Sequence, residues 1–139
     1  MRIYVASSWR NEAQPEVVER LRFQGHEVYD FKDADGFSWK EITEEPPEEW
    51  GTIRWLSALH HPAAQRGFAR DMSALATAHA CILVLPSGRS AHLEAGWAIG
   101  RGVRTAVYVA EYDTPDLMVK MADLVTGNLE HLLDWAGWA

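Results

Sequence analysis

The sequence is poor in cysteine and in basic residues and has no long hydrophobic run, and each shortage excludes a class of protein. The single cysteine, Cys81, excludes an internal disulfide and a metal site rich in thiolates. Lys and Arg total 13 against 20 Asp and Glu, so binding to polymeric nucleic acid is not expected. The longest apolar run, residues 80–86, has the length of a strand, and neither a membrane span nor a secretory signal is predicted. We therefore expect a cytoplasmic protein.

The residues that are present fit one globular domain, which we place at residues 1–139. This length is usual for a single domain. Hydrophobic residues make up 47% and charged residues 24%, a balance typical of folded rather than disordered chains. We find no internal repeat, low-complexity tract or linker.

The hydrophobic pattern predicts strands and helices in alternation. Strands are predicted at residues 2–6, 27–31, 80–85 and 103–109, with a short extended piece at 124–126. Helices are predicted from Pro15 to Gly25 and at residues 64–79, 91–99, 117–123 and 129–135. The run 80–85 is apolar throughout, as in a central parallel strand. This order predicts an α/β fold, a flavodoxin-like or Rossmann-like three-layer sandwich with a four- or five-stranded parallel sheet.

Residues 32–61 follow no clear period. They combine glycines, prolines and acidic residues with the aromatic residues Phe37, Trp39, Trp50 and Trp55. A structureless loop of this length is unusual in a compact domain, so we expect it to contain a short helix or to form a lid. It is either an irregular insertion anchored to the core by its aromatic residues or a lid over a substrate.

Two polar loops follow predicted strands, where open parallel sheets bind their ligands. They comprise residues 7–11 and residues 87–90. The second loop leads into a helix N-terminus, which favours an anion, while Arg89 adds a charge and Ser87 and Ser90 add hydroxyl groups. Alternatively, Ser90 only caps the helix. Neither the P-loop motif nor GxGxxG is present.

Glu94 and Asp71 interrupt the apolar patterns of their helices. At helical spacing their neighbours are apolar, Ala91, Trp97 and Ala98 around Glu94 and Phe68, Met72 and Leu75 around Asp71. Each carboxylate alone could be a cap or part of an ion pair, but together they fit a site with two carboxylates.

Tyr4 and the histidines complete the candidates for chemistry. Tyr4 in the first strand either packs in the core or donates its hydroxyl to a carboxylate. His60 and His61 lack metal-ligand spacing, and His92 lies two positions before Glu94 and so faces elsewhere. We expect no metal and no other cofactor, and Cys81 should be an inert buried thiol.

Three segments in register resemble the nucleoside 2-deoxyribosyltransferases and the related N-glycosidases of nucleoside 5′-monophosphates. They are residues 3–9, 71–75 and 90–96, and the likeness spans most of the chain. The resemblance implies a flavodoxin-like enzyme in which Glu94 attacks the anomeric carbon and Tyr4 orients it.

The same resemblance assigns further residues. It implies that Asp71 is catalytic and can support protonation of the leaving base, that Trp9 lines the base pocket, and that Asp116 and Met118 complete the site of a neighbouring subunit. A homodimer or higher homo-oligomer with shared active sites follows from it. The residues expected to bind substrate are Ser7, Trp9, Arg10, Phe37, Trp39, Ser87, Gly88, Arg89, Ser90, Asp116 and Met118.

The loop at residues 87–90 departs from the transferase pattern. Transferases carry acidic residues there, whereas this loop is basic and rich in hydroxyl groups, which favours a 5′-phosphate. We therefore favour a hydrolytic N-glycosidase acting on a nucleoside or nucleoside 5′-monophosphate over a base-exchanging transferase. Arg10 could assist in binding the phosphate, and Phe37 and Trp39 could stack on the base.

Two classes remain as alternatives. A non-catalytic nucleotide-binding or signalling module has the same element order and needs no nucleophile. A flavodoxin-type redox protein that binds FMN is also compatible with this order, but the loops lack its run of Ser and Thr.

Overall fold

The computed structural model describes residues 1–33 and 36–137, which form two compact units. The sheet unit joins residues 1–30 to residues 74–137, and the insert unit comprises residues 31–73. The helix α3 (Pro62–Thr77) belongs to both, since its last turn enters the sheet unit. The assignment of residues 1–139 to one domain remains a prediction.

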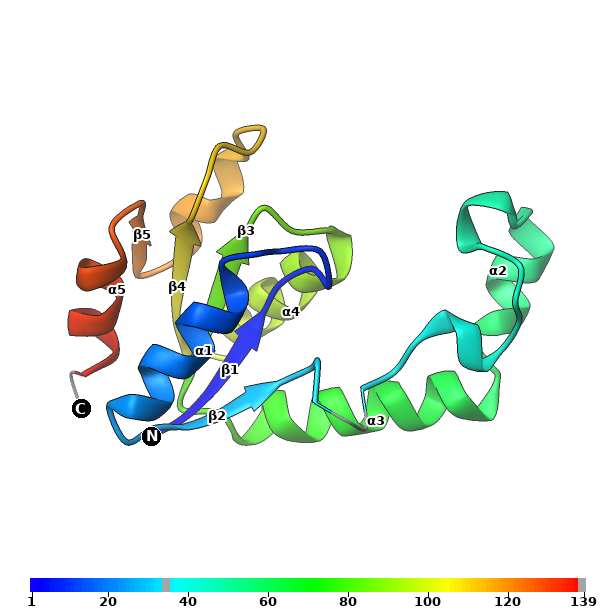
Figure 1. The fold of residues 1–139 in the computed structure, drawn as a ribbon, viewed down its shortest axis with the longest axis horizontal. Coiled ribbons are helices and arrows are strands. Elements are labelled where there is room, and N and C mark those ends of the chain that lie inside the picture. The colour runs from blue at the N-terminus through cyan, green and yellow to red at the C-terminus, as the bar shows by residue number, and fades with distance from the viewer. Residues whose placement is uncertain (34–35, 138–139) are drawn as a thin grey trace. The chain divides into compact units, whose positions relative to one another are not determined.

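The sheet unit contains five parallel strands in the order β2-β1-β3-β4-β5, which confirms the predicted α/β fold (Figure 1). The strands are β1 (Arg2–Ala6), β2 (Glu27–Asp30), β3 (Ala80–Leu85), β4 (Arg104–Val109) and β5 (Leu124–Thr126). Every residue of β3 is buried, as its apolar sequence predicts for a central strand. This strand order is the flavodoxin-like one, in which the chain reverses direction across the sheet between β1 and β3.

Helices cover both faces of the sheet. The helices α1 (Gln14–Phe23) and α5 (Leu129–Ala136) lie on one face, and α4 (Arg89–Gly100) lies on the other (Figure 1). Val17, Leu21 and Leu132 pack with alternate strand residues such as Val5 and Ile82 to form the main core. On the opposite face α4 packs over β3 and contacts β1 and β4. The first turn of α4 therefore begins at the edge of the sheet where ligands bind in this fold.

Two predicted elements differ in detail. The helix α4 begins at Arg89 rather than residue 91, with Gly88 as its N-cap and no side-chain cap, so the interpretation of Ser90 as the cap is wrong. Gly88 has an extended backbone there, which suits the residue before the first turn. The helix predicted at residues 117–123 is the shorter 3-10 helix η3 (Leu117–Met121), started by the Asp116 side chain, which accepts a hydrogen bond from the Met118 amide.

The insert unit contains short helices, as expected for a long segment without clear periodicity. These are η1 (Trp39–Glu41), η2 (Pro47–Glu49) and α2 (Thr52–Ala58), followed by α3. Phe37 and Trp50 each contact the Trp39 ring edge to face, with ring centres 4.9 and 5.4 Å apart. A Cβ atom at Gly67 would lie 2.7 Å from the Cβ of Phe37, so glycine is required for this loop to approach α3. Whether the segment is a lid remains a prediction.

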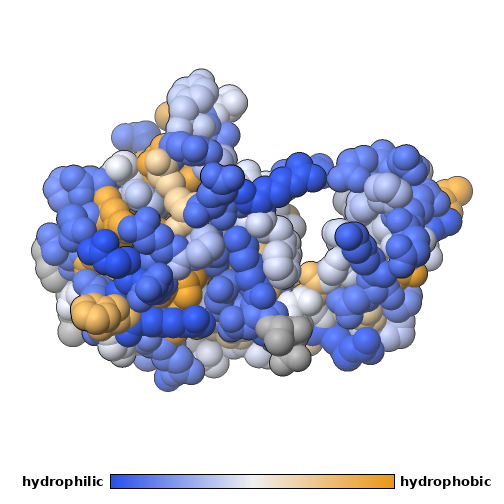
Figure 2. Space-filling view, viewed as in Figure 1, coloured by the Kyte–Doolittle hydropathy of each residue, from blue (hydrophilic) through white to orange (hydrophobic). Residues whose placement is uncertain are grey.

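The surface is largely polar. On the face of the molecule seen in Figure 2, hydrophilic residues cover most of the surface, in keeping with the net charge of −7. Within residues 1–33 and 36–137, no helix is long and apolar enough to cross a membrane.

Cys81 generates a prediction about thiol chemistry. Its side chain is fully buried in β3, and burial, together with the nearby charge of Glu94, raises the pKa of the thiol to about 12. We expect the native protein to be inert to a thiol-specific alkylating reagent at pH 8, and the protein unfolded in urea to react fully, as measured by mass spectrometry. Because unfolding returns the pKa to about 8.5, stability should fall as the pH rises above that value. Equal alkylation rates in the two states would contradict this prediction.

Candidate active site

A hydrogen bond between β1 and α4 lies at the centre of the candidate site. The buried Tyr4 hydroxyl donates to Oε2 of Glu94, whose side chain is half-buried. The Tyr4 ring is held in place by stacking on Tyr29 of β2, with ring centres 5.1 Å apart. A hydrogen bond donated to a carboxylate stabilises its charged form and restricts its rotamers. Tyr4 and Glu94 therefore form the contact that the sequence predicts, while their catalytic roles remain predictions.

The Glu94 carboxylate also acts on Cys81, which lies beside Tyr4 in the sheet. Tyr4 is paired with Cys81 across β1 and β3, and the Glu94 carboxylate contributes to the raised pKa of the Cys81 thiol. The larger cause is burial of the thiol. The hydrogen bond donated by the Tyr4 hydroxyl favours the charged form of the Glu94 carboxylate.

Asn11 connects the two polar loops. Its Nδ2 donates to the Pro86 carbonyl at 3.0 Å and to the Val84 carbonyl at 3.4 Å, while its Oδ1 accepts from the Ala13 and Gln14 amides at 2.8 Å each. The Asn11 side chain is only 5% exposed. One buried amide therefore holds the start of α1 against the chain that leaves β3.

Ser7 reinforces the same connection. Its hydroxyl donates to the Val84 carbonyl at 2.8 Å, so its proton is used within the fold. Trp9 and Arg10 follow in this loop and are exposed, with 54% of Trp9 accessible. The role of Trp9 in base binding remains a prediction.

The first turn of α4 presents backbone donors. The first amides of a helix have no partner within the helix, and no side chain caps this one. Gly88, Arg89 and Ser90 are exposed there, so these donors and the Arg89 charge are accessible from solvent. Exposed amides at a helix N-terminus favour an anion, and binding of one here remains a prediction.

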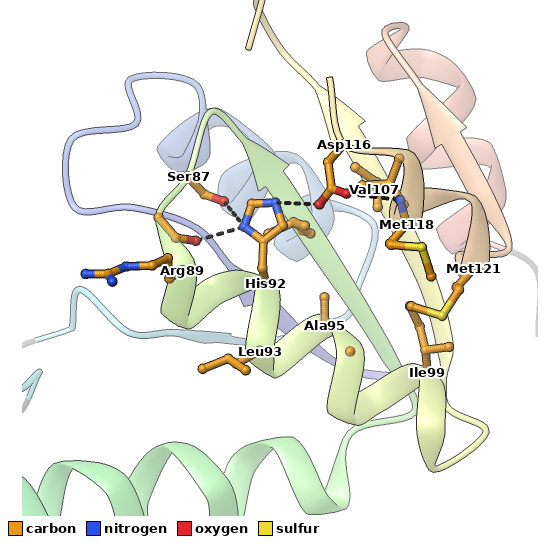
Figure 3. Close-up of a pocket in the computed structure, with 14 residues that line it drawn as sticks. Ser87, Arg89, His92, Leu93, Ala95, Ile99, Val107, Asp116, Met118 and Met121 are labelled. Atoms are coloured by element: carbon orange, nitrogen blue, oxygen red, sulfur yellow. Dashed lines mark hydrogen bonds and ion pairs between the residues drawn. The ribbon is translucent and has the colours of Figure 1, made fainter. Parts of the chain in front are cut away.

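A cavity of about 700 Å³ lies on the β4 side of α4 (Figure 3), and its lining residues do not include Tyr4 or Glu94. Leu83 and Val107 form its floor, and α4 and η3 form its walls. Its polar end contains Ser87, Gly88, Arg89, His92 and Asp116. Its apolar end contains Leu93, Ala95, Gly96, Ile99, Met118, Val119 and Met121.

The structure thus distributes the predicted site residues among three places. Tyr4 and Glu94 pair on the β1 side of α4, and Ser7, Trp9 and Arg10 occupy the neighbouring loop. Ser87, Gly88, Arg89, Asp116 and Met118 line the cavity on the β4 side. Asp71, Phe37 and Trp39 belong to the insert unit, and their participation in the site remains a prediction.

Sequence reasoning missed two residues. Asn11 is part of the predicted polar loop, and its Oδ1 accepts from amides two and three residues further on, a turn that Asn favours just ahead of a helix. His92 was set aside because it faces away from Glu94, and it does face away, toward Asp116. The partner of His92, Asp116, is identified by the structure and by no pattern in the sequence.

Within the part of the chain that the structure describes, no three His, Cys, Asp or Glu side chains come together as a metal ion requires. The site is therefore described through its carboxylate, its hydroxyl groups and its backbone amides.

No protein-family model matches the sequence, and no curated protein sequence matches it. Solved structures do match. A 2-deoxyribosyltransferase from Bacillus psychrosaccharolyticus is 18% identical, with a TM-score of 0.64 over 96% of this chain and 91% of that chain. A CMP N-glycosidase from Clostridium botulinum is 13% identical, with a TM-score of 0.59 over 99% of this chain and 100% of that chain.

A conserved protein from Enterococcus faecalis is also similar, with 11% identity and a TM-score of 0.63 over 98% of this chain and 96% of that chain. These likenesses extend over nearly the whole of each chain. The chain therefore has the flavodoxin-like α/β fold found in a 2-deoxyribosyltransferase and in a CMP N-glycosidase, in agreement with the resemblance read from its sequence.

Proposed function

We propose that this chain is an enzyme that cleaves the N-glycosidic bond of a nucleoside or nucleoside 5′-monophosphate, with Glu94 as the nucleophile. The observation that carries the proposal is the hydrogen bond from Tyr4 to Glu94, which orients a carboxylate beside the ligand-binding edge of the sheet. The fold shared with two enzymes that act on such bonds supports it.

The chemistry requires an ionised carboxylate close to the sugar. A Glu94 oxygen attacks C1′ through a transition state with oxocarbenium character, and the C1′–N bond breaks with its electron pair passing to the base. Protonation of the base makes its departure easier, and we assign support of that proton to Asp71. Attack of water on the glycosyl-enzyme then releases the sugar and regenerates the carboxylate.

Water is favoured over a second base as the acceptor because of the first turn of α4. Ser87, Arg89, Ser90 and the free amides fit a 5′-phosphate, which a nucleoside site does not need. We assign the base to the region of Trp9 and the phosphate to Arg10, and stacking of Phe37 and Trp39 on the base remains a prediction. Base exchange by a 2-deoxyribosyltransferase is the alternative reaction of the same site.

The cavity on the β4 side of α4 supports a homo-oligomer with shared sites. Three apolar side chains around it are strongly exposed, Leu93 at 75%, Met118 at 57% and Met121 at 52%. An apolar groove of this kind is typical of a contact surface, and we assign a second copy of the chain to it. In that arrangement Asp116 and Met118 can reach the site of the neighbouring copy.

A non-catalytic nucleotide-binding module remains the second candidate, because the anion-accepting turn of α4 needs no nucleophile. The two candidates differ in base release. A panel of purine and pyrimidine nucleosides and their 5′-monophosphates, with and without an acceptor base, distinguishes hydrolysis, transfer and binding alone.

Glu94→Gln should lower the rate of base release by at least about a thousand-fold, because an amide cannot serve as the nucleophile. Tyr4→Phe should lower it by about ten- to a hundred-fold, the scale of one hydrogen bond to a charged group. Chromatography of the released base measures both effects. Tyr108→Phe on β4 is the matched control, and circular dichroism reports the folding of each variant. Turnover by Glu94→Gln at the wild-type rate would refute the assignment.

Arg89→Gln should raise KM for a nucleoside 5′-monophosphate by about ten-fold and leave KM for the matching nucleoside unchanged, since only the phosphate meets its charge. Arg101→Gln, at the other end of α4, is the control and should change neither value. An equal rise in KM for both substrates would exclude phosphate binding at this turn.

Met121→Glu places a charge in the apolar groove and should shift the oligomer toward the monomer, as measured by sedimentation velocity. Phe23→Glu is the control, because Phe23 is 91% exposed on α1, on the other face of the sheet. If Met121→Glu sediments as the wild type does, the groove is not the contact surface.

A further inference from the structure

His92 is held in one orientation by the first turn of its own helix. Its Nδ1 lies 2.8 Å from the Gly88 carbonyl oxygen (Figure 3). A carbonyl oxygen only accepts, so Nδ1 carries the proton of that contact. The Ser87 hydroxyl lies 3.4 Å from the same nitrogen. With Nδ1 occupied by the loop, Nε2 is the nitrogen that faces the cavity.

Asp116 is the group that faces this nitrogen. Its Oδ2 lies 3.9 Å from Nε2 of His92, and its Oδ1 accepts from the Met118 amide at 3.0 Å. Asp116 thus caps η3 with Oδ1 and directs Oδ2 toward the imidazole ring of His92. Both side chains are partly exposed, His92 at 32% and Asp116 at 46%.

The charges around the ring are few. Among the described residues that line the cavity, the charged or titratable side chains are Arg89, Asp116 and His92 itself. The Arg89 guanidinium points away from the imidazole ring in Figure 3. Asp116 is therefore the charge that the ring faces across the cavity. A neutral Nε2 offers the carboxylate only a lone pair, whereas a protonated Nε2 offers a positive charge and a hydrogen-bond donor.

We propose that His92 is a positioning residue. Its protonated ring forms an ion pair with Asp116 and so holds η3 against the first turn of α4. The contact joins the loop after β3 to the segment after β4. The attraction to Asp116 requires a proton on Nε2 of the ring, so lower pH favours the contact and higher pH weakens it.

The consequence for catalysis depends on the proposed function. In a homo-oligomer with shared sites, the ring would hold Asp116 and Met118 in place for the neighbouring copy and set the affinity for substrate. The effect then falls on KM more than on kcat, because His92 faces away from Glu94.

Three substitutions separate the roles of the two ring nitrogens. His92→Asn keeps a donor near the position of Nδ1 and removes Nε2. His92→Gln places an amide near Nε2, so it can donate to Asp116 but does not titrate. Asp116→Asn removes the charge opposite the ring.

The kinetic measurement is the ratio of KM at pH 8 to KM at pH 6. The wild type and the variants are compared on the same substrate, so that ionisation of the substrate affects all of them equally. We expect each substitution to reduce this ratio by about two- to five-fold, the scale of one exposed ion pair. His92→Asn combined with Asp116→Asn should have no larger effect than either alone. An unchanged ratio, or effects that multiply in the double variant, would overturn the proposal.

Thermal unfolding tests the contact without any turnover. We compare His92→Asn, Asp116→Asn and the variant that carries both. At pH 6 the Tm change of the double variant should differ from the sum of the two single changes by about 1–4 °C, and at pH 8 the changes should add. Coupling at pH 6 without turnover on any substrate would support the contact between His92 and Asp116 and contradict the proposed enzymatic function. Turnover without coupling would support the enzymatic function and contradict the contact.

Discussion

The hydrogen bond from Tyr4 to Glu94 is the contact on which the candidate site depends. It requires a tyrosine that is almost fully buried in β1, held against Tyr29, and a helix that crosses above it with a carboxylate on the correct face. A fixed donor favours the charged form of this carboxylate and holds its orientation. The fold and the chemistry are therefore linked through one pair of atoms.

The helix α4 separates two environments. Its β1 side carries the carboxylate, and its β4 side carries the cavity, while its first turn is accessible to both. His92 and Glu94 therefore have different partners, Asp116 and Tyr4, although they are two residues apart in sequence.

The fold was predictable because its signals are local. The apolar run of β3 and the regular spacing of α1 follow from short-range patterns. The pairing of Tyr4 with Glu94, 90 residues apart, was expected only through the family resemblance. The contacts of Asn11 with Val84 and of His92 with Asp116 join segments distant in sequence, and no periodicity encodes them. The start of α4 was misplaced because serine is a common cap, whereas glycine in an extended conformation occupies that position here.

The buried amide of Asn11 has a consequence for how this chain can diverge or be re-engineered. Because it links the start of α1 to the carbonyl groups of Val84 and Pro86, the spacing between β1 and Asn11 cannot change without moving both loops. Insertions are tolerated instead where the backbone makes few such bonds. A library that varies specificity should accordingly keep residues 6–11 constant in length and diversify the exposed side chains of Trp9 and Arg10.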